Sequence, residues 1–261
     1  MKKYSFLLPA LLMLLASCEK VVNIDLNNAA AQYVIEGAVY EGIDTVEVQI
    51  AKTTDYYGRA PQEQINNAIV TLSDDAGNLT NIPFAGEGKY LLPNFQAFAG
   101  RRYDLKVVIN GNEFNASSVM PQAVNIDSVS VEFKNADFRA AGYEVAARFT
   151  DAVNEKNFYR LVYIINDTLQ NTPNDLYLLD DKFNDGKPIR ADLFRRFEIG
   201  DKVEFELLSM DEQVFDFFTT LNDVLNNQNG PAPANPNSNI KGGALGYFAT
   251  FTSSKKGIIV N

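Results

Sequence analysis

The chain has 261 residues, and its 46 % hydrophobic content is enough for one large or two ordinary packed domains. Its net charge of −10 disfavours binding to nucleic acid or to anionic lipid headgroups, because both depend on Lys and Arg. The lack of histidine excludes Ser-His-Asp catalysis and His-based zinc sites, and the single cysteine excludes an intramolecular disulfide. We therefore expect no nucleic-acid partner, no cofactor, no metal site and no enzyme activity.

Residues 1–17 have the features of a bacterial signal peptide. Lys2 and Lys3 form a basic start, and residues 6–15 form an apolar run that is too short to span a bilayer. Leu15-Ala16-Ser17-Cys18 then matches the lipobox pattern Leu-[Ala/Ser]-[Gly/Ala]-Cys, with Ser in the third position. The alternative is an ordinary secretory signal that happens to be followed by a cysteine.

The lipobox predicts cleavage between Ser17 and Cys18 and attachment of lipid to the Cys18 thiol. Small residues suit the cleavage site, and the thiol has no other cysteine with which to pair. Two or three acyl chains would hold the mature protein on a membrane. Glu19 follows the cysteine, whereas Asp at this position often retains Gram-negative lipoproteins in the inner membrane, so the sequence favours the outer membrane. The leaflet stays open.

Residues 18–122 are predicted to form a tether and a β-sandwich. Residues 18–31 end in small and polar residues and are interpreted as the tether. From residue 32 the apolar residues alternate with period two, and Asn110-Gly111 is a strong hairpin signal. Strands are expected at 32–37, 45–50, 68–72, 79–84, 88–92, 103–109 and 113–119. This spacing is typical of an immunoglobulin- or transthyretin-like β-sandwich, assigned to residues 32–122.

Tyr56 and Tyr57 lie in the first long loop of that unit and are the predicted binding residues. Loop aromatics can stack on sugars or contact a protein partner. The alternative is that these side chains belong to the core.

Pro121 marks the boundary of a second unit, residues 123–261, which is also predicted to be rich in β-structure. Strands are expected at 126–133, 143–149, 158–165, 176–179, 197–199, 203–208, 245–251 and 257–260. One amphipathic helix is expected near residues 210–226, because Ser209 and Glu212 have capping-box spacing and apolar residues follow at helical intervals.

The segment 180–186 has a weak resemblance to a calcium-binding loop. Placing Gly186 sixth puts Asp181 first, Asp185 fifth and Asp192 twelfth. Phe183 then occupies a ligand position, and the twelfth position is Asp instead of Glu. A turn with solvated carboxylates is therefore the preferred interpretation, and a calcium site is the alternative.

Three stretches together carry a resemblance to a known family: residues 18–26, residues 68–75 and residues 235–248. The chain resembles the Gram-negative lipoprotein family of domain of unknown function 4249, over essentially the whole mature chain. The resemblance implies an outer-membrane lipoprotein, often encoded beside a TonB-dependent receptor, and it implies no catalytic residues. The expected function is a non-catalytic accessory role to such a receptor in nutrient capture. The alternative is a structural or adhesive envelope lipoprotein without a transport partner.

Overall fold

The computed structural model describes residues 31–54, 61–226 and 235–261. The strands of the first half are β1 (Tyr33–Tyr40), β2 (Gly42–Lys52), β3 (Ile69–Asp74), β4 (Leu79–Ile82), β5 (Phe84–Gly86), β6 (Lys89–Ala97), β7 (Arg102–Ile109) and β8 (Asn112–Val119). The remaining elements are β9 (Ile126–Lys134), β10 (Gly142–Thr150), β11 (Phe158–Ile165), β12 (Thr168–Leu169), the 3-10 helix η2 (Pro173–Asp175), β13 (Tyr177–Asp180), β14 (Pro188–Asp192), β15 (Lys202–Met210), helix α2 (Glu212–Asn226) and β16 (Leu245–Ile259).

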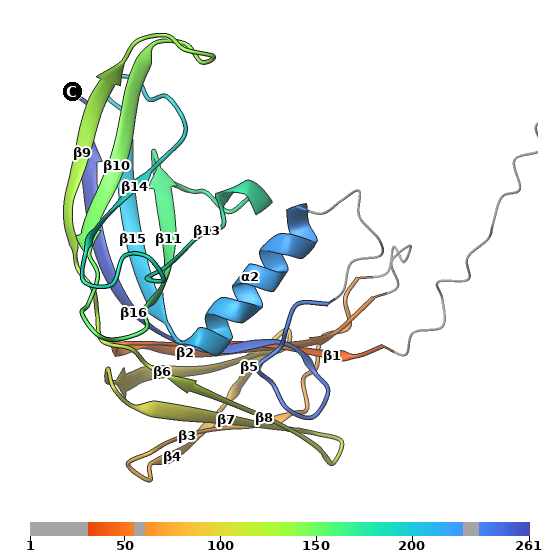
Figure 1. The fold of residues 1–261 in the computed structure, drawn as a ribbon. Coiled ribbons are helices and arrows are strands. Elements are labelled where there is room, and N and C mark those ends of the chain that lie inside the picture. The colour runs from red at the N-terminus through yellow and green to blue at the C-terminus, as the bar shows by residue number, and fades with distance from the viewer. Residues whose placement is uncertain (1–30, 55–60, 227–234) are drawn as a thin grey trace, which may run out of the picture.

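Two β-sandwiches share one large, bent sheet (Figure 1). Its strand order is β12-β11-β15-β16-β1-β2-β6-β5, and β13 also pairs with β11. The sheet β4-β3-β7-β8 covers one end of it, and the sheet β14-β10-β9 covers the other. The expected mainly-β class with one amphipathic helix is confirmed.

The first sandwich follows the alternation in the sequence. Val46, Val48 and Ile50 all point into one core, which also holds residues from β3, β7 and β8. The hairpin between β7 and β8 turns at Asn110 and Gly111, which have φ of 50° and 82°. Positive φ at both turn positions is what a two-residue hairpin requires, so the Asn-Gly signal predicted this connection correctly.

The last strand belongs to both halves of the molecule. β16 pairs in parallel with β1 from Leu245 to Phe251, and then antiparallel with β15 from Thr252 to Ile259. The first core accordingly contains Ile240, Ala244 and Phe248. Two corrections follow: the expected strands 245–251 and 257–260 are one strand, and residues 123–261 do not all belong to the second unit.

The second sandwich has its own core between β9, β10 and β14 on one side and β11 and β15 on the other. The expected strand at 197–199 is not formed, since Phe197 makes only an isolated bridge with Tyr143. Strand β14 was not expected. Pro188 opens it, and β14 lies at the edge of the three-stranded sheet, where a strand can begin with proline without losing a ladder hydrogen bond.

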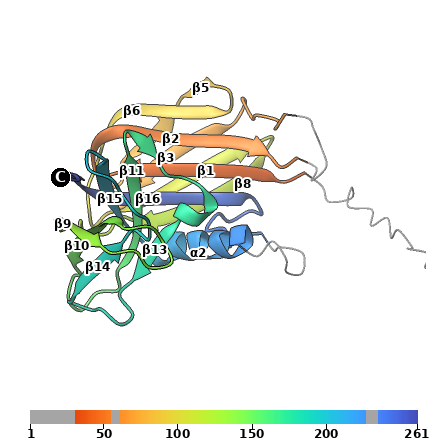
Figure 2. The same cartoon turned by 90° about the horizontal axis from the view of Figure 1, so that it is seen from above.

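Helix α2 lies in the angle of the bent sheet and covers part of its concave face (Figures 1 and 2). Its buried residues Val214, Phe217 and Phe218 pack with residues of β15 and β16. The predicted apolar face is therefore correct. The predicted Ser209 cap is wrong, because β15 continues through Met210 and Ser209 is a buried strand residue.

Asp211 is the residue that caps the helix, and it also joins the two halves of the molecule. Its Oδ1 accepts the backbone N–H of Val214 at 3.0 Å. Its Oδ2 accepts the Ser118 hydroxyl at 2.6 Å and the Val119 N–H at 2.9 Å, both from β8. One carboxylate thus satisfies a helix N-terminus and the end of a strand in the other sandwich.

Replacing Asp211 with alanine is expected to lower the free energy of unfolding by about 2–3 kcal/mol, because a cap and two further charge-assisted hydrogen bonds are lost. Urea unfolding followed by circular dichroism measures the change. The matched control is Asp223→Ala on the exposed side of the same helix, for which a change within about 0.5 kcal/mol is expected. Equal destabilisation by the two substitutions would contradict the role of Asp211.

Candidate functional site

The residues predicted for lipidation, cleavage and binding, namely Ser17, Cys18, Tyr56 and Tyr57, lie outside the described residues. Among the residues that are described, no helix is both long and apolar enough to cross a membrane. Candidate sites in the described ranges are therefore built from other side chains.

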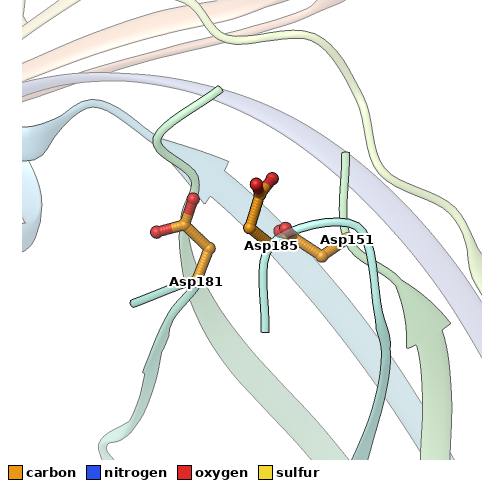
Figure 3. A group of neighbouring side chains, drawn as sticks. All are labelled: Asp151, Asp181 and Asp185. Carbon is orange, nitrogen blue, oxygen red and sulfur yellow. The ribbon is translucent and has the colours of Figure 1, made fainter. Parts of the chain in front are cut away.

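The acidic loop at 180–186 does bring carboxylates together, but the group includes Asp151, which the sequence did not suggest. Asp181 and Asp185 meet Asp151, which directly follows β10, and oxygen atoms of the three lie within 4.8 Å of one another (Figure 3). Asp192 is not part of this group, because it pairs with Arg190 at 2.8 Å on β14. The twelve-residue calcium-loop alignment is therefore wrong at its last position.

Hydrogen bonds within the loops account for this cluster. Asp151 is only 2 % exposed and accepts the Tyr159 hydroxyl at 2.5 Å and the Gly186 N–H at 3.1 Å. Asp181 accepts the Asn157 N–H at 3.1 Å, and Asp185 accepts the Asn154 N–H at 2.8 Å. Burial, together with the hydrogen bond to Asp151, raises the pKa of Tyr159.

An oxygen-only set of this kind suits a hard cation such as Ca²⁺, which takes six to eight oxygen ligands. The three carboxylates already accept loop donors, and those hydrogen bonds explain why the loops meet here. The cluster is therefore interpreted as a structural hydrogen-bond network that joins the loops at 151–157 and 181–187.

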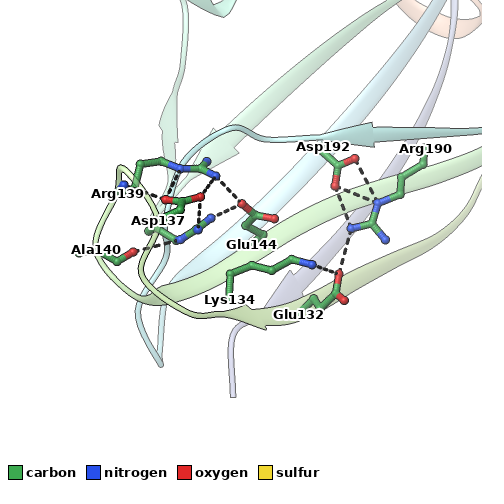
Figure 4. A network of polar contacts seen from close by, with 9 residues as sticks. Glu132, Lys134, Asp137, Arg139, Ala140, Glu144, Arg190 and Asp192 are labelled. Atoms are coloured by element: carbon green, nitrogen blue, oxygen red, sulfur yellow. Dashed lines mark hydrogen bonds and ion pairs between the residues drawn. The ribbon is translucent and has the colours of Figure 1, made fainter.

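A second polar group ties the β9–β10 hairpin to the segment that follows β14 (Figure 4). Arg139 contacts Glu144 at 2.9 Å and Asp137 at 3.0 Å, and Arg196 contacts the same two carboxylates. The Arg196 and Glu144 side chains are only 12 % and 15 % exposed. The Arg139 side chain and backbone N–H, with help from Arg196, lower the pKa of Asp137 to about 2.

The segments joined by this network carry three exposed aromatic side chains, which we name the aromatic tip: Phe133, Phe138 and Phe194. Phe138 is 91 % exposed, and Phe194 is 81 % exposed. Arg139 lies over the Phe138 ring at 4.8 Å. Exposed aromatic rings are typical of protein-binding surfaces.

The aromatic tip was missed from the sequence, although a signal for it exists. Phe138 interrupts the polar turn between two alternating strands, and Phe194 precedes two arginines outside any strand. A large aromatic residue in a turn is exposed unless the chain folds back over it. The prediction favoured Tyr56 and Tyr57 because these aromatic residues lie in the first long loop of the first unit.

Comparison with known proteins gives one family. A family model described as Domain of unknown function (DUF4249) matches residues 19–257. No curated protein matches the chain. Among solved structures, a two-domain fibronectin type III segment from chicken tenascin is similar at 14 % sequence identity, over 69 % of this chain and 91 % of that one. Its TM-score of 0.23 is too low to carry an argument, so the fold description rests on the sheets themselves.

Proposed function

Because the chain belongs to the family of domain of unknown function 4249, we propose that it is a lipid-anchored outer-membrane protein and a non-catalytic accessory to a TonB-dependent receptor in nutrient capture. The family description assigns no activity. The proposal combines the lipobox with the position of an exposed contact surface on the folded domain.

The anchor rests on Leu15-Ala16-Ser17-Cys18 and the single thiol of the chain. A net charge of −10 disfavours attraction to anionic lipid, so acyl chains are the means of attachment that the chemistry favours. Glu19 instead of Asp after the cysteine supports the outer membrane.

The observation that carries the partner proposal is the separation between the start of the folded domain and the aromatic tip. Val34, near the start of β1, pairs with Leu245, the first residue of β16. From there β16 runs for 15 residues, about 45 Å along the chain, and Gly200 hydrogen-bonds to Val260 just beyond its end. The segment that carries Phe194 thus lies far from the end at which the tether joins. A lipid-anchored molecule built this way presents its aromatic tip away from its attachment point, where a receptor can reach it.

Substituting both Phe138 and Phe194 with aspartate is expected to reduce receptor recovered with the protein by about tenfold or more, since aromatic anchors dominate protein interfaces. The measurement is quantitative mass spectrometry after detergent extraction and affinity purification. Because both rings are exposed, thermal melting should not change.

The matched control is Phe183→Asp, which alters a similarly exposed phenylalanine in another loop and should leave recovery unchanged. Equal recovery with the double variant, or an equal loss with the control, would contradict a role for the aromatic tip.

The second candidate function is a structural or adhesive envelope lipoprotein. It predicts that purification recovers no TonB-dependent receptor at near-stoichiometric amounts. The receptor proposal predicts that one is recovered.

A further inference from the structure

The concave face of the large sheet carries a hollow beside helix α2. On β1, Glu36, Ala38 and Tyr40 face this side, while the alternate residues enter the first core. The small Ala38 side chain forms the floor of the hollow, and larger side chains from β1, β2 and β16 surround it. We name this hollow the concave groove; it has a volume of about 390 Å³, and its lining residues include Glu36, Ala38, Tyr40, Asp44, Glu47 and Tyr247. Seen from above in Figure 2, α2 lies beside β16 and does not cover β1 and β2.

The strand register explains which side chains surround Ala38. Glu36 is paired with Tyr247 on β16 and with Gln49 on β2, and Ala38 is paired with Ala249 and Glu47. Cross-strand partners share a face of the sheet, so these side chains stand around Ala38. A volume of this size accommodates a small ligand.

Three polar groups of the concave groove are unpaired within the described ranges. No hydrogen bond or ion pair there involves the Glu36 carboxylate or the hydroxyls of Tyr40 and Tyr247. The other polar lining residues have partners: Glu47 pairs with Lys89 at 3.3 Å, Asp44 accepts the Thr45 N–H at 2.7 Å, and the Gln49 amide donates to Gln64 at 2.6 Å. Burial and the charge of Glu36 raise the pKa of Tyr247 to about 12, so its hydroxyl stays a donor at neutral pH.

A positive charge lies near the two tyrosines of the groove, although Arg160 is not itself one of the lining residues. Arg160 of β11 lies 4.8 Å from the Phe218 ring, and Phe218 lies 5.2 Å from Tyr247. The charge of Arg160 acts on the hydroxyls of both Tyr40 and Tyr247. Its guanidinium has no carboxylate partner among the described residues, although it is only partly exposed. Arginine in such a position is normally paired.

We propose that the concave groove binds a small zwitterion, an amino acid or a short peptide. Its ammonium group faces the carboxylates of Glu36, Asp44 and Glu47, and its carboxylate faces the two tyrosine hydroxyls, on the side of the groove nearest Arg160. Guanidinium and carboxylate groups form two parallel hydrogen bonds, and ammonium groups bind favourably to carboxylates and aromatic faces.

Other small ligands fit the charges less well. A neutral sugar leaves charges of both signs unpaired, a simple cation leaves Arg160 unpaired, and a simple anion leaves Glu36 unpaired. The inference does not depend on the lipid anchor or on a receptor, so it can fail while the proposed function stands.

Calorimetric titration of the mature protein in detergent tests the proposal with four probes: dialanine, N-acetyl-dialanine, dialanine amide and maltotriose. We expect dialanine to bind with saturation. Blocking either terminus should weaken binding about tenfold or more, and maltotriose should give no heat. Failure of dialanine to bind, equal binding of the blocked forms, or binding of maltotriose alone would overturn the proposal. This comparison uses only the wild-type protein, so it does not rely on any variant folding.

Variants then assign each end of the ligand. In Glu36→Gln, N-acetylation of dialanine should no longer weaken binding, whereas amidation still should. In Arg160→Met, amidation should no longer weaken binding, whereas N-acetylation still should. The methionine side chain can still pack on Phe218. Ala38→Leu should abolish binding by filling the floor. The control Glu155→Gln, in an exposed loop, should bind like the wild type. The same loss of affinity in Glu36→Gln and Glu155→Gln would contradict the assignment.

Discussion

Replacing Cys18 with alanine is expected to abolish both lipid labelling and membrane attachment. The thiol is the one atom of the chain that can accept diacylglycerol, because no second cysteine exists. Since each buried methylene contributes about 0.8 kcal/mol, losing two or three acyl chains removes essentially all membrane affinity. Labelling with a clickable fatty-acid analogue and fractionation of membranes measure the two effects.

The matched control for this substitution is Ser17→Ala. Alanine agrees with the lipobox pattern at that position, so labelling and attachment should persist. Labelling that survives in Cys18→Ala would refute lipidation at this residue.

Replacing Gly246 with alanine is expected to lower the free energy of unfolding by about 4 kcal/mol or more. Gly246 lies in β16 where it pairs with Ile35, and its φ of +95° is unfavourable for residues with a side chain. A Cβ there would lie 2.1 Å from the carbonyl oxygen of Ile35. Relief requires β16 to separate from β1, which breaks the join between the two sandwiches. Chemical unfolding of the purified variant measures the loss.

Gly243→Ala is the control for this prediction. Its φ of +88° is similar, but a Cβ there meets open space, so only the backbone strain of about 1 kcal/mol is expected. If both alanine variants unfold at the same denaturant concentration, the close approach of Gly246 to Ile35 does not matter for stability.

Local features of the fold could be predicted from the sequence. The alternation at residues 45–50, the Asn110-Gly111 turn and the apolar face of the helix are each decided by residues close together in the chain. For such elements, hydrophobic periodicity and turn chemistry are sufficient evidence.

Features made by distant residues could not be predicted in this way. The pairing of Val34 with Leu245 joins opposite ends of the chain, and no periodicity in either strand identifies the other. The helix cap was misplaced because Ser209 and Asp211 both suit an N-cap, and the extent of β15 decided between them. The contact of Asp151 with the loop at 181–187 likewise depends on how β10 and β14 pair.

The candidate sites also differ in whether neighbouring or distant residues of the chain form them. The lipobox is a contiguous motif and is visible in the sequence, whereas the concave groove needs β1, β2, β11 and β16 to be brought together. The aromatic tip lies between these cases. Phe138 stands in a recognisable turn, whereas the segment of Phe194 meets that hairpin only in the fold, where Arg196 pairs with Asp137 and Glu144.

We propose a lipid-anchored protein that works together with a TonB-dependent receptor. Native mass spectrometry of the complex purified from outer membranes tests both parts in one measurement. We predict a mature chain that begins at Cys18 and carries the mass of its acyl groups, bound to a receptor in near-equal amounts. A chain with an unmodified N-terminus, or a lipidated chain recovered without any receptor, would contradict the claim.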